Sequence, residues 1–358
     1  MERVRAGIIG CGGIATGKHM PSLQALGNVD MVAFMDASEE RAAAAKEQYG
    51  APGSRVYTDY RRLLDDTDID AVHICTPNKS HSEISVAALT AGKHVMCEKP
   101  MAIDGAGARA MVDAAERTGR LLTIGYNNRF RDDSLYLKRC CERGDLGHIY
   151  YAKAHAVRRR AVPTWGVFLN AEVQGGGPLI DIGTHALDLT LWMMDNYDPL
   201  YAVGSVYHAL NDTENAANAF GPWDPAAFTV EDSAFGFIKM RNGATVLLES
   251  SWALNTLDTG EAMTTLCGTL AGATMKGGLS INGEDMGKLY VKEVQPGPSG
   301  MDFYEGDSEN PEVREARTFI SAITDGTPLT VKPEEALAVS LILEGVYRSA
   351  ESGEPYYF

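Results

Sequence analysis

Small residues with a characteristic spacing follow a short apolar segment near the start of the chain. Gly10, Gly12 and Ala15 come after residues 4–9 in the pattern G-x-G-x-x-A, ahead of a segment expected to be helical. The first glycine permits a tight turn, the second leaves room for a pyrophosphate, and the third small residue lets helix pack on strand. Asp36 ends the next apolar segment, where a carboxylate could bind both ribose hydroxyls and would repel a 2′-phosphate. The spacing therefore predicts a dinucleotide site for NAD.

Two other interpretations of this region stay open. A glycine-rich turn can serve backbone geometry alone, without binding any ligand. Ser38 and Arg41 lie close to Asp36 in the sequence and could contact a 2′-phosphate, which makes NADP the less favoured alternative cofactor.

A lysine stands where another predicted strand ends. In the segment 94–100, HVMCEKP, Lys99 lies between Glu98 and Pro100. Ligands bind at the carboxyl ends of strands in open α/β sheets, so this amine could hydrogen-bond a substrate hydroxyl. The alternative is an ordinary solvated lysine at a strand end.

One polar stripe runs along an otherwise apolar segment that begins near Pro178. Its members are spaced as i, i+3, i+4 and i+7, which places them on one face of a helix: Asp181, Thr184, His185 and Asp188. A carboxylate and an imidazole on one buried face are costly unless they satisfy each other or face a cavity.

These residue types suit the oxidation of a secondary alcohol. In that reaction a hydride leaves carbon for the nicotinamide, and a base must take the hydroxyl proton. Histidine, with a reference pKa near ~6.5, is the side chain best matched to accept a proton at neutral pH, which favours His185. Lys99 would orient the hydroxyl and stabilise the developing alkoxide, and Asp181 would position the imidazole or bind a neighbouring hydroxyl.

The stripe also allows purely structural interpretations. Asp181 would lie in the first turn of the helix, where the helix dipole favours a carboxylate. His185 could be a core histidine whose hydrogen bonds are satisfied internally. A metal site would need a third ligand, which the sequence does not offer, so no metal is expected.

The order of predicted elements divides the chain in two. Strand-like and helix-like segments alternate over residues 1–125, as in a doubly wound parallel sheet, which predicts an α/β dinucleotide-binding domain of the Rossmann type. Over 126–358, strands follow one another between helices, and Asn242-Gly243 is a strong hairpin sequence. This half is predicted to be an α+β domain with a mainly antiparallel sheet, for substrate binding and oligomerisation.

Composition excludes several partners. The net charge is −16, which disfavours nucleic acid and anionic membranes, and no basic run longer than residues 158–160 offsets it. No apolar segment approaches the ~18 residues of a membrane span, and no secretory signal is recognisable at the start. The six cysteines contain no C-x-x-C pair, which is typical of a reducing cytoplasm.

One predicted strand is apolar on both faces. In the segment 231–240, small and aliphatic residues alternate with Phe235 and Phe237. A sheet covered on one side only would not tolerate this pattern in water. We expect another subunit to cover the second face, giving a dimer or tetramer; the alternative is coverage by helices of the same chain.

Taken together, these motifs resemble the Gfo/Idh/MocA oxidoreductase family along essentially the whole chain. The matching segments are GCGGIA, CTPNKSH, EKP, GGGPLIDIGTHALDL and the closing segment 328–355. The resemblance implies a large open sheet in the second domain, with one face used for oligomer contacts. It also implies a cis peptide between Lys99 and Pro100.

The resemblance implies roles for individual residues. Catalysis would fall to Lys99, Asp181 and His185. The cofactor would be bound by Gly10, Gly12, Gly13, Ile14, Asp36, Thr76, Asn78, His81, Glu98 and Lys99. The substrate would contact Lys99, Arg129, His155, Trp165, Asp181 and His185, with Trp165 suited to the apolar face of a sugar ring.

The implied activity is NAD-dependent oxidation of a sugar, a glycoside or a cyclitol such as inositol. The segment from Val162 to Met194 resembles family members that oxidise the 3-hydroxyl of glucose in glycosides. Two alternatives stay open: a glycosidase that keeps its NAD and works by transient oxidation and elimination, and a dinucleotide sensor without catalysis.

Overall fold

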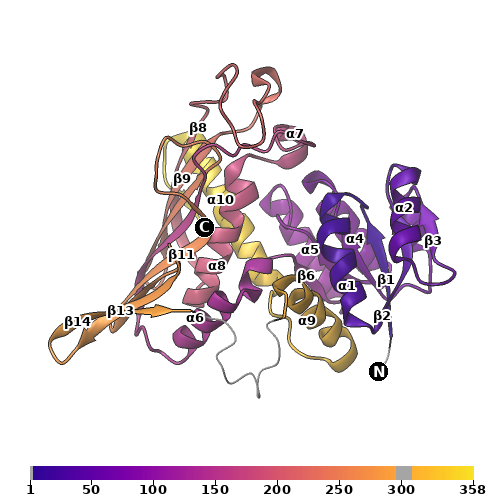
Figure 1. Ribbon diagram of the computed structural model, residues 1–358, viewed down its shortest axis with the longest axis horizontal. Helices are drawn as coiled ribbons and strands as arrows, with labels where there is room; N and C mark the ends of the chain where they lie inside the picture. The colour runs from indigo at the N-terminus through magenta and orange to yellow at the C-terminus, as the bar shows by residue number, and fades with distance from the viewer. Residues whose placement is uncertain (1–2, 296–308) are drawn as a thin grey trace. The chain divides into compact units, whose positions relative to one another are not determined.

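The computed structural model describes residues 3–295 and 309–358, which form two compact units (Figure 1). The first unit comprises Met1–Asn127 and Glu309–Leu337, and the second comprises Asn128–Ser308 and Ala338–Phe358. None of the helices in the described ranges is both long and apolar enough to cross a bilayer.

The first unit contains a six-stranded parallel sheet in the order β3-β2-β1-β4-β5-β6. Its strands are β1 (Val4–Ile9), β2 (Val29–Met35), β3 (Arg55–Tyr57), β4 (Ala71–Ile74), β5 (His94–Cys97) and β6 (Leu122–Ile124). Its helices are η1 (Ala15–His19), α1 (Met20–Leu26), α2 (Glu39–Tyr49), α3 (Tyr60–Leu64), η2 (Asn78–Ser80), α4 (His81–Thr90), α5 (Gly105–Thr118) and α9 (Pro311–Asp325). The strand order reverses between β1 and β4, which is where ligands bind in sheets of this kind.

Local sequence explains these elements. The strands β1 and β4 are short, mainly apolar runs whose residues are buried apart from Arg5, as expected of parallel strands between helix layers. Ser38 and Asp104 cap α2 and α5 through side-chain oxygens that accept main-chain N–H groups. Gly119 ends α5 in the left-handed conformation, with φ of 65°.

Helix α9 belongs to the first unit although it lies late in the chain. Its buried residues Ala316, Phe319 and Ile320 join the core that also contains residues of β1, α1 and β2. The pattern of strands and helices in the sequence instead predicts one continuous domain over 126–358. The amphipathic face of α9 is the reason for the difference, because it completes a core that the first 127 residues leave open.

The second unit contains a nine-stranded sheet in the order β14-β13-β12-β11-β7-β10-β9-β8-β15. Its strands are β7 (Ile149–Val157), β8 (Pro199–Tyr207), β9 (Ser233–Met240), β10 (Thr245–Ser251), β11 (Gly260–Gly268), β12 (Ala271–Thr274), β13 (Leu279–Asp285), β14 (Lys288–Val294) and β15 (Tyr356–Tyr357). The pairing of β7 with β10 is parallel and the other pairings are antiparallel. The predicted fold class, a parallel α/β sheet followed by a large, mainly antiparallel sheet, is confirmed.

The helices of the second unit complete it. They are α6 (Asp132–Glu142), α7 (Ala171–Gln174), η4 (Leu179–Gly183), α8 (Thr184–Met194) and η5 (Pro225–Ala227), with η3 (Asn127–Phe130) at its start. Helix α10 (Pro333–Ser352) begins in the first unit and ends in the second. The predicted hairpin joins β9 to β10, and Gly243 has the positive φ of 92° that its turn requires.

Helices α8 and α10 lie along one face of this sheet (Figure 1). The contact is close enough that a Cβ on Gly204 would lie 2.1 Å from the carbonyl oxygen of Val346 in α10. On the opposite face, Phe237 pairs in register with Val203, and these side chains are 38% and 40% exposed. Within the described ranges, the helices of the second unit therefore leave that face open.

We predict that a second copy of the chain covers this open face. Light scattering at micromolar concentration should give a mass of at least twice the 38.6 kDa of one chain. Phe237→Lys should lower that mass, because association would bury an unpaired ammonium. Leu257→Lys, which adds the same charge at a loop residue 86% exposed, is the control and should not. A monomeric wild type would contradict the prediction.

Candidate active site

The glycine turn after β1 has the geometry of a ligand cradle. Gly10 has a φ of 91°, and a Cβ there would lie 2.7 Å from the main-chain carbonyl of Cys75, so this position requires glycine. A Cβ at Gly12 or Gly13 would meet no atom of the described residues within 4 Å, which leaves room for a phosphate beside the backbone. The helix that follows begins as a π-helical turn, η1, rather than as the regular α-helix expected from the sequence.

Asp36 joins this turn to the end of β2. Its carboxylate accepts hydrogen bonds from the main-chain N–H groups of Cys11 at 2.9 Å and Ser38 at 2.8 Å, and from the guanidinium of Arg41 at 2.8 Å. Burial disfavours the charge, but Arg41 and the two N–H groups outweigh it and lower the pKa of Asp36. An ionised carboxylate therefore lies where a ribose would be bound, and the open turn and this charge fit NAD.

The segment around Lys99 is held by side chains on both sides. The Lys99–Pro100 peptide is cis, as the family resemblance implied. The ring nitrogens of His81 lie 2.7 Å from the carbonyl oxygen of Pro100 and 2.8 Å from that of Thr76. His81 is buried and committed to the main chain, so we no longer count it among the residues that would touch the cofactor. Thr76 and Asn78 lie at the end of β4 and are partly exposed.

Glu98 is the centre of a buried polar network. Its carboxylate contacts Lys18 and His19 directly. Glu315 is paired with Lys18, and His73 is in contact with His19. None of these four residues was predicted from the sequence. Lys18 and His19 follow the glycine turn directly, and this position was the sequence signal that could have identified them. Glu315 lies on the buried face of α9, where a carboxylate interrupts an apolar stripe.

In the second unit, the predicted polar stripe divides into two parts. Thr184 and Asp188 are buried, whereas Asp181 and His185 are partly exposed. Asp181 accepts a hydrogen bond of 3.0 Å from Nε1 of Trp252. The turn that carries Asp181 is π-helical, and such turns occur often at functional sites. Asp181 and His185 are therefore the members of the stripe that could meet a ligand.

The start of this helix is anchored by Glu231, which sequence analysis missed. Its carboxylate accepts hydrogen bonds from the N–H groups of Gly177 at 2.7 Å and Leu179 at 3.1 Å, and from the hydroxyl of Tyr347 at 2.8 Å. A Cβ on Gly176 would lie 2.1 Å from that hydroxyl, and one on Gly177 would lie 2.2 Å from the carbonyl oxygen of Glu231. The glycines before Pro178 thus make room for this anchor. Burial raises the pKa of Glu231.

Arg129 was predicted to contact the substrate, but it lies in the interior of the second unit. Its guanidinium is fully buried and donates to both carboxylate oxygens of Asp188, at 2.6 and 3.0 Å. It also lies over the ring of Trp192, 5.4 Å from the centroid. Arg129 therefore supports α8 from inside the unit, and we withdraw it from the residues proposed to contact substrate.

The predicted role of His155 as a substrate contact also changes. Side chains alternate along a strand, and the neighbouring Ala154 lies on the face of β7 that carries α8: its partner Thr264 is hydrogen-bonded to Thr190 of that helix. His155 consequently points to the opposite face, where Nδ1 lies 2.8 Å from a carboxylate oxygen of Glu249. It cannot share a ligand with Asp181 and His185.

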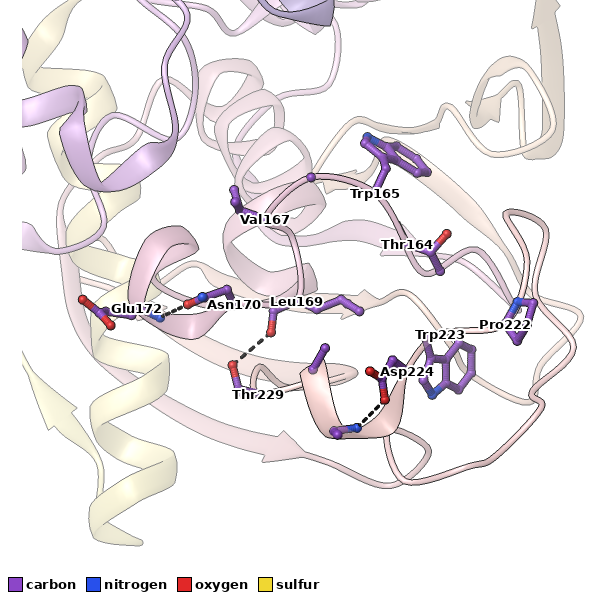
Figure 2. A pocket seen from close by; sticks show the side chains of 13 residues that line it. Thr164, Trp165, Val167, Leu169, Asn170, Glu172, Pro222, Trp223, Asp224 and Thr229 are labelled. Carbon is purple, nitrogen blue, oxygen red and sulfur yellow. Dashed lines mark hydrogen bonds between the residues drawn. The ribbon is translucent and has the colours of Figure 1, made fainter. Parts of the chain in front are cut away.

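Trp165, the remaining predicted substrate contact, lines a cavity of about 790 Å³ within the second unit (Figure 2). The walls are the loops 164–172 and 222–229, joined by a hydrogen bond of 2.9 Å from the hydroxyl of Thr229 to the carbonyl oxygen of Leu169. The indole is 52% exposed and packs edge-on against Phe168 and Phe220. The residues that line the cavity also include the acidic Glu172 and Asp224.

Aromatic contacts connect this cavity to Asp181. Phe168 packs edge-on against Trp252 with a centroid separation of 6.5 Å, and Trp252 donates to the Asp181 carboxylate. The loop that holds Trp165 and the turn that holds Asp181 therefore rest on a shared aromatic group.

Family models match both halves of the chain. A model described as an oxidoreductase family with an NAD-binding Rossmann fold matches residues 4–126, and a GFO/IDH/MocA C-terminal domain model matches residues 134–273. D-glucoside 3-dehydrogenase of Escherichia coli is 35% identical over 353 residues, covering 98% of this chain and 96% of that enzyme. The chain belongs to the Gfo/Idh/MocA family.

Other proteins are similar to this chain over part of its sequence or in their fold. Levoglucosan dehydrogenase of Pseudarthrobacter phenanthrenivorans is 30% identical over 60% of this chain and 57% of its own. A solved levoglucosan dehydrogenase complex with NADH and levoglucosan superposes with a TM-score of 0.84 at 22% identity, covering 99% of each chain, which confirms the fold. As a family member, the chain is an NAD-binding oxidoreductase.

Asp36→Ala should weaken NAD binding and narrow the preference of this family member for NAD over NADP. We expect the ratio of the two Kd values to change by about tenfold, which corresponds to ~1.4 kcal/mol, because the charge that repels a 2′-phosphate is removed. Fluorescence titration with NAD and with NADP measures the two Kd values. Asp30→Ala, which breaks an exposed pair with Arg3 at the other end of β2, is the control. Equal wild-type Kd values would refute the NAD preference.

Glu231→Ala should lower the free energy of unfolding by about 1–3 kcal/mol, because the buried N–H groups of Gly177 and Leu179 lose their acceptor. Urea unfolding followed by tryptophan fluorescence measures the change. Tyr347→Phe removes one hydrogen bond but leaves that acceptor in place, so it should cost less. An equal or smaller loss in Glu231→Ala would show that the carboxylate does not anchor the helix.

Proposed function

We propose that this protein is an NAD-dependent dehydrogenase that oxidises a secondary hydroxyl of a glucoside, at C3 of the glucose ring, to a ketone. The observation that carries this proposal is the 35% identity to D-glucoside 3-dehydrogenase along nearly the full length of both chains. The more distant relatives named as dehydrogenases of levoglucosan and myo-inositol support a carbohydrate or cyclitol substrate in general.

The proposed chemistry gives each candidate residue one task. Bound NAD supplies the hydride acceptor. His185 takes the hydroxyl proton as general base, and its partly exposed position on α8 leaves it open to a ligand. Asp181, whose carboxylate is fixed by Trp252, orients the base or a neighbouring hydroxyl. Lys99 donates a hydrogen bond to the reacting oxygen and stabilises the charge that develops there.

The cavity beside Trp165 supports a carbohydrate substrate. An exposed indole can pack on the apolar face of a sugar ring, and Phe168 and Phe220 hold this one in place. The carboxylates of Glu172 and Asp224 can accept hydrogen bonds from sugar hydroxyls. With a net charge of −16, the protein also favours a neutral substrate over an anionic one.

A substrate panel tests the proposed function. Glucosides, free sugars and inositols are incubated with NAD, and the absorbance of NADH and the release of aglycone are followed together. NADH formation with a glucoside, and a 3-keto product, support the proposal. Aglycone release without net NADH would instead identify a glycosidase that retains its cofactor, and cofactor binding without any turnover would identify a sensor.

His185→Ala should lower kcat by at least ~10²-fold while the Kd for NAD stays nearly unchanged, because a general base is lost. In the wild type, the oxidation rate should fall as the pH drops through the pKa of this base. Lys99→Ala should be similarly impaired, and the double variant should be little worse than the worse single variant, because the residues act together. If His185→Ala has a lower Tm but normal turnover, His185 is a core histidine. The role of proton acceptor would then pass to Lys99.

A further inference from the structure

Five ionisable side chains meet in the core of the first unit. Lys18 and His19 come from η1, His73 from β4, Glu98 from the end of β5 and Glu315 from α9. All are less than one-tenth exposed. The ammonium of Lys18 lies 2.8 Å from Glu98 and 2.9 Å from Glu315, and the ring of His19 joins Glu98 to His73 through contacts of 2.8 and 2.9 Å.

A buried group of this kind is an expensive way to stabilise a core. Desolvation of a buried ion pair often outweighs its Coulomb attraction, and well-packed apolar residues of similar volume are frequently as stable or more so. Among the described residues, two atoms of this group find no hydrogen-bond partner: Nε2 of His73 and Oε1 of Glu315. Stability alone therefore does not explain the network.

The network ends on the main chain of Lys99. One oxygen of Glu98 accepts from Lys18 and His19, and the other accepts the N–H of Lys99 at 3.0 Å. The carboxylate lies against the main chain of Gly125, where a Cβ would come within 3.1 Å of it. On the other side of Lys99, Nδ1 of His81 lies 2.7 Å from the carbonyl oxygen of Pro100.

Charge holds Glu98 in the state that this contact needs. Burial favours its neutral form, but Lys18 and His19 outweigh burial and hold the pKa of Glu98 well below its usual value. Burial likewise opposes the charge on Lys18, and Glu315 and Glu98 raise its pKa. The other titratable groups near Glu98 are kept neutral by burial, which lowers the pKa values of the imidazoles and raises those of the thiols: His73, His81, Cys75 and Cys97.

We propose that Lys18 and Glu315 are positioning residues, which act through the carboxylate of Glu98 to fix the backbone of Lys99. The inference rests on the proposed function only in giving Lys99 a role in the reaction. It also ties that role to the cofactor turn, because Lys18 lies on the helix that the turn begins.

The test replaces the ion pair with apolar residues of similar size, in the double variant Lys18→Met/Glu315→Leu. We expect its Kd for NAD to stay close to wild type, whereas its Tm should fall, because Glu98 keeps His19 but loses its cationic partner. Hydrogen exchange at the Lys99 amide should become at least ~10-fold faster, because its acceptor is no longer held in place. On a glucoside that the wild type oxidises, kcat should fall ~10-fold or more with little change in KM.

The pH dependence separates positioning from a merely structural role. Without the ammonium of Lys18, Glu98 protonates at higher pH, and a protonated carboxyl is a weaker acceptor for the Lys99 N–H. The deficit in kcat should therefore grow as the pH falls and shrink as it rises. Glu98→Gln, which removes the charge but keeps the shape, should show a deficit that does not change with pH, and it serves as the test if the double variant does not fold.

Lys93→Met is the matched control. Lys93 is a buried lysine that precedes β5, whereas Glu98 follows it. Its ammonium donates hydrogen bonds to the carbonyl oxygens of Asp66 and Ile69. Its replacement should lower Tm but leave exchange at Lys99, kcat and the pH profile unchanged. Unaltered exchange at Lys99 in Lys18→Met/Glu315→Leu, or a kcat within twofold of wild type at every pH, would overturn the proposal.

Failure of the proposed function gives a different result. If Lys99→Ala retains turnover, or if the wild type oxidises no glucoside, the role assigned to Lys99 is wrong, whereas the exchange measurement still decides whether Lys18 and Glu315 hold its backbone. If Lys99→Ala loses turnover and the double variant keeps it, the positioning role alone is wrong.

Discussion

Hydrogen bonds from main-chain amides to buried carboxylates hold each of the three segments on which the proposed activity depends. Asp36 accepts from Cys11 in the glycine turn, Glu98 accepts from Lys99, and Glu231 accepts from Gly177 and Leu179 at the start of the helix that carries Asp181 and His185. A charged acceptor forms shorter and stronger hydrogen bonds than a neutral one, and it is most effective where water is excluded. The same device thus fixes a loop, a strand end and a helix start.

The parts of this arrangement that follow from local sequence could be predicted. The glycine turn, Asp36, the alternation of strand and helix, and the polar stripe after Pro178 are all encoded by residues close to one another in the chain. The two π-helical turns could not, because a helix with one extra residue in a turn has nearly the same hydrophobic spacing as a regular one. Both π turns occur in segments that carry proposed site residues.

Glu315 and Glu231 were missed for a different reason. Glu315 is 297 residues from Lys18, and Glu231 is 54 residues from Gly177, so no local period relates them. The errors at Arg129 and His155 have the same origin. Whether a strand residue faces a helix or the open side of a sheet depends on which neighbours the topology supplies, and the buried pairing of Arg129 with Asp188 becomes visible only once α8 is in place.

The discontinuous make-up of the first unit affects how proteins of this family can be recombined. A segment ending at Asn127 contains all six strands of the dinucleotide-binding sheet but lacks Phe319 and Ile320 of α9, which close its core, and Glu315, which pairs with Lys18. A chimaera that joins the front of one relative to the back of another at a single crossover would therefore pair a sheet with a foreign closing helix. An exchange that keeps both units intact requires three crossovers, after Asn127, Ser308 and Leu337, so that α9 stays with the sheet that it completes and the end of α10 stays with the second unit.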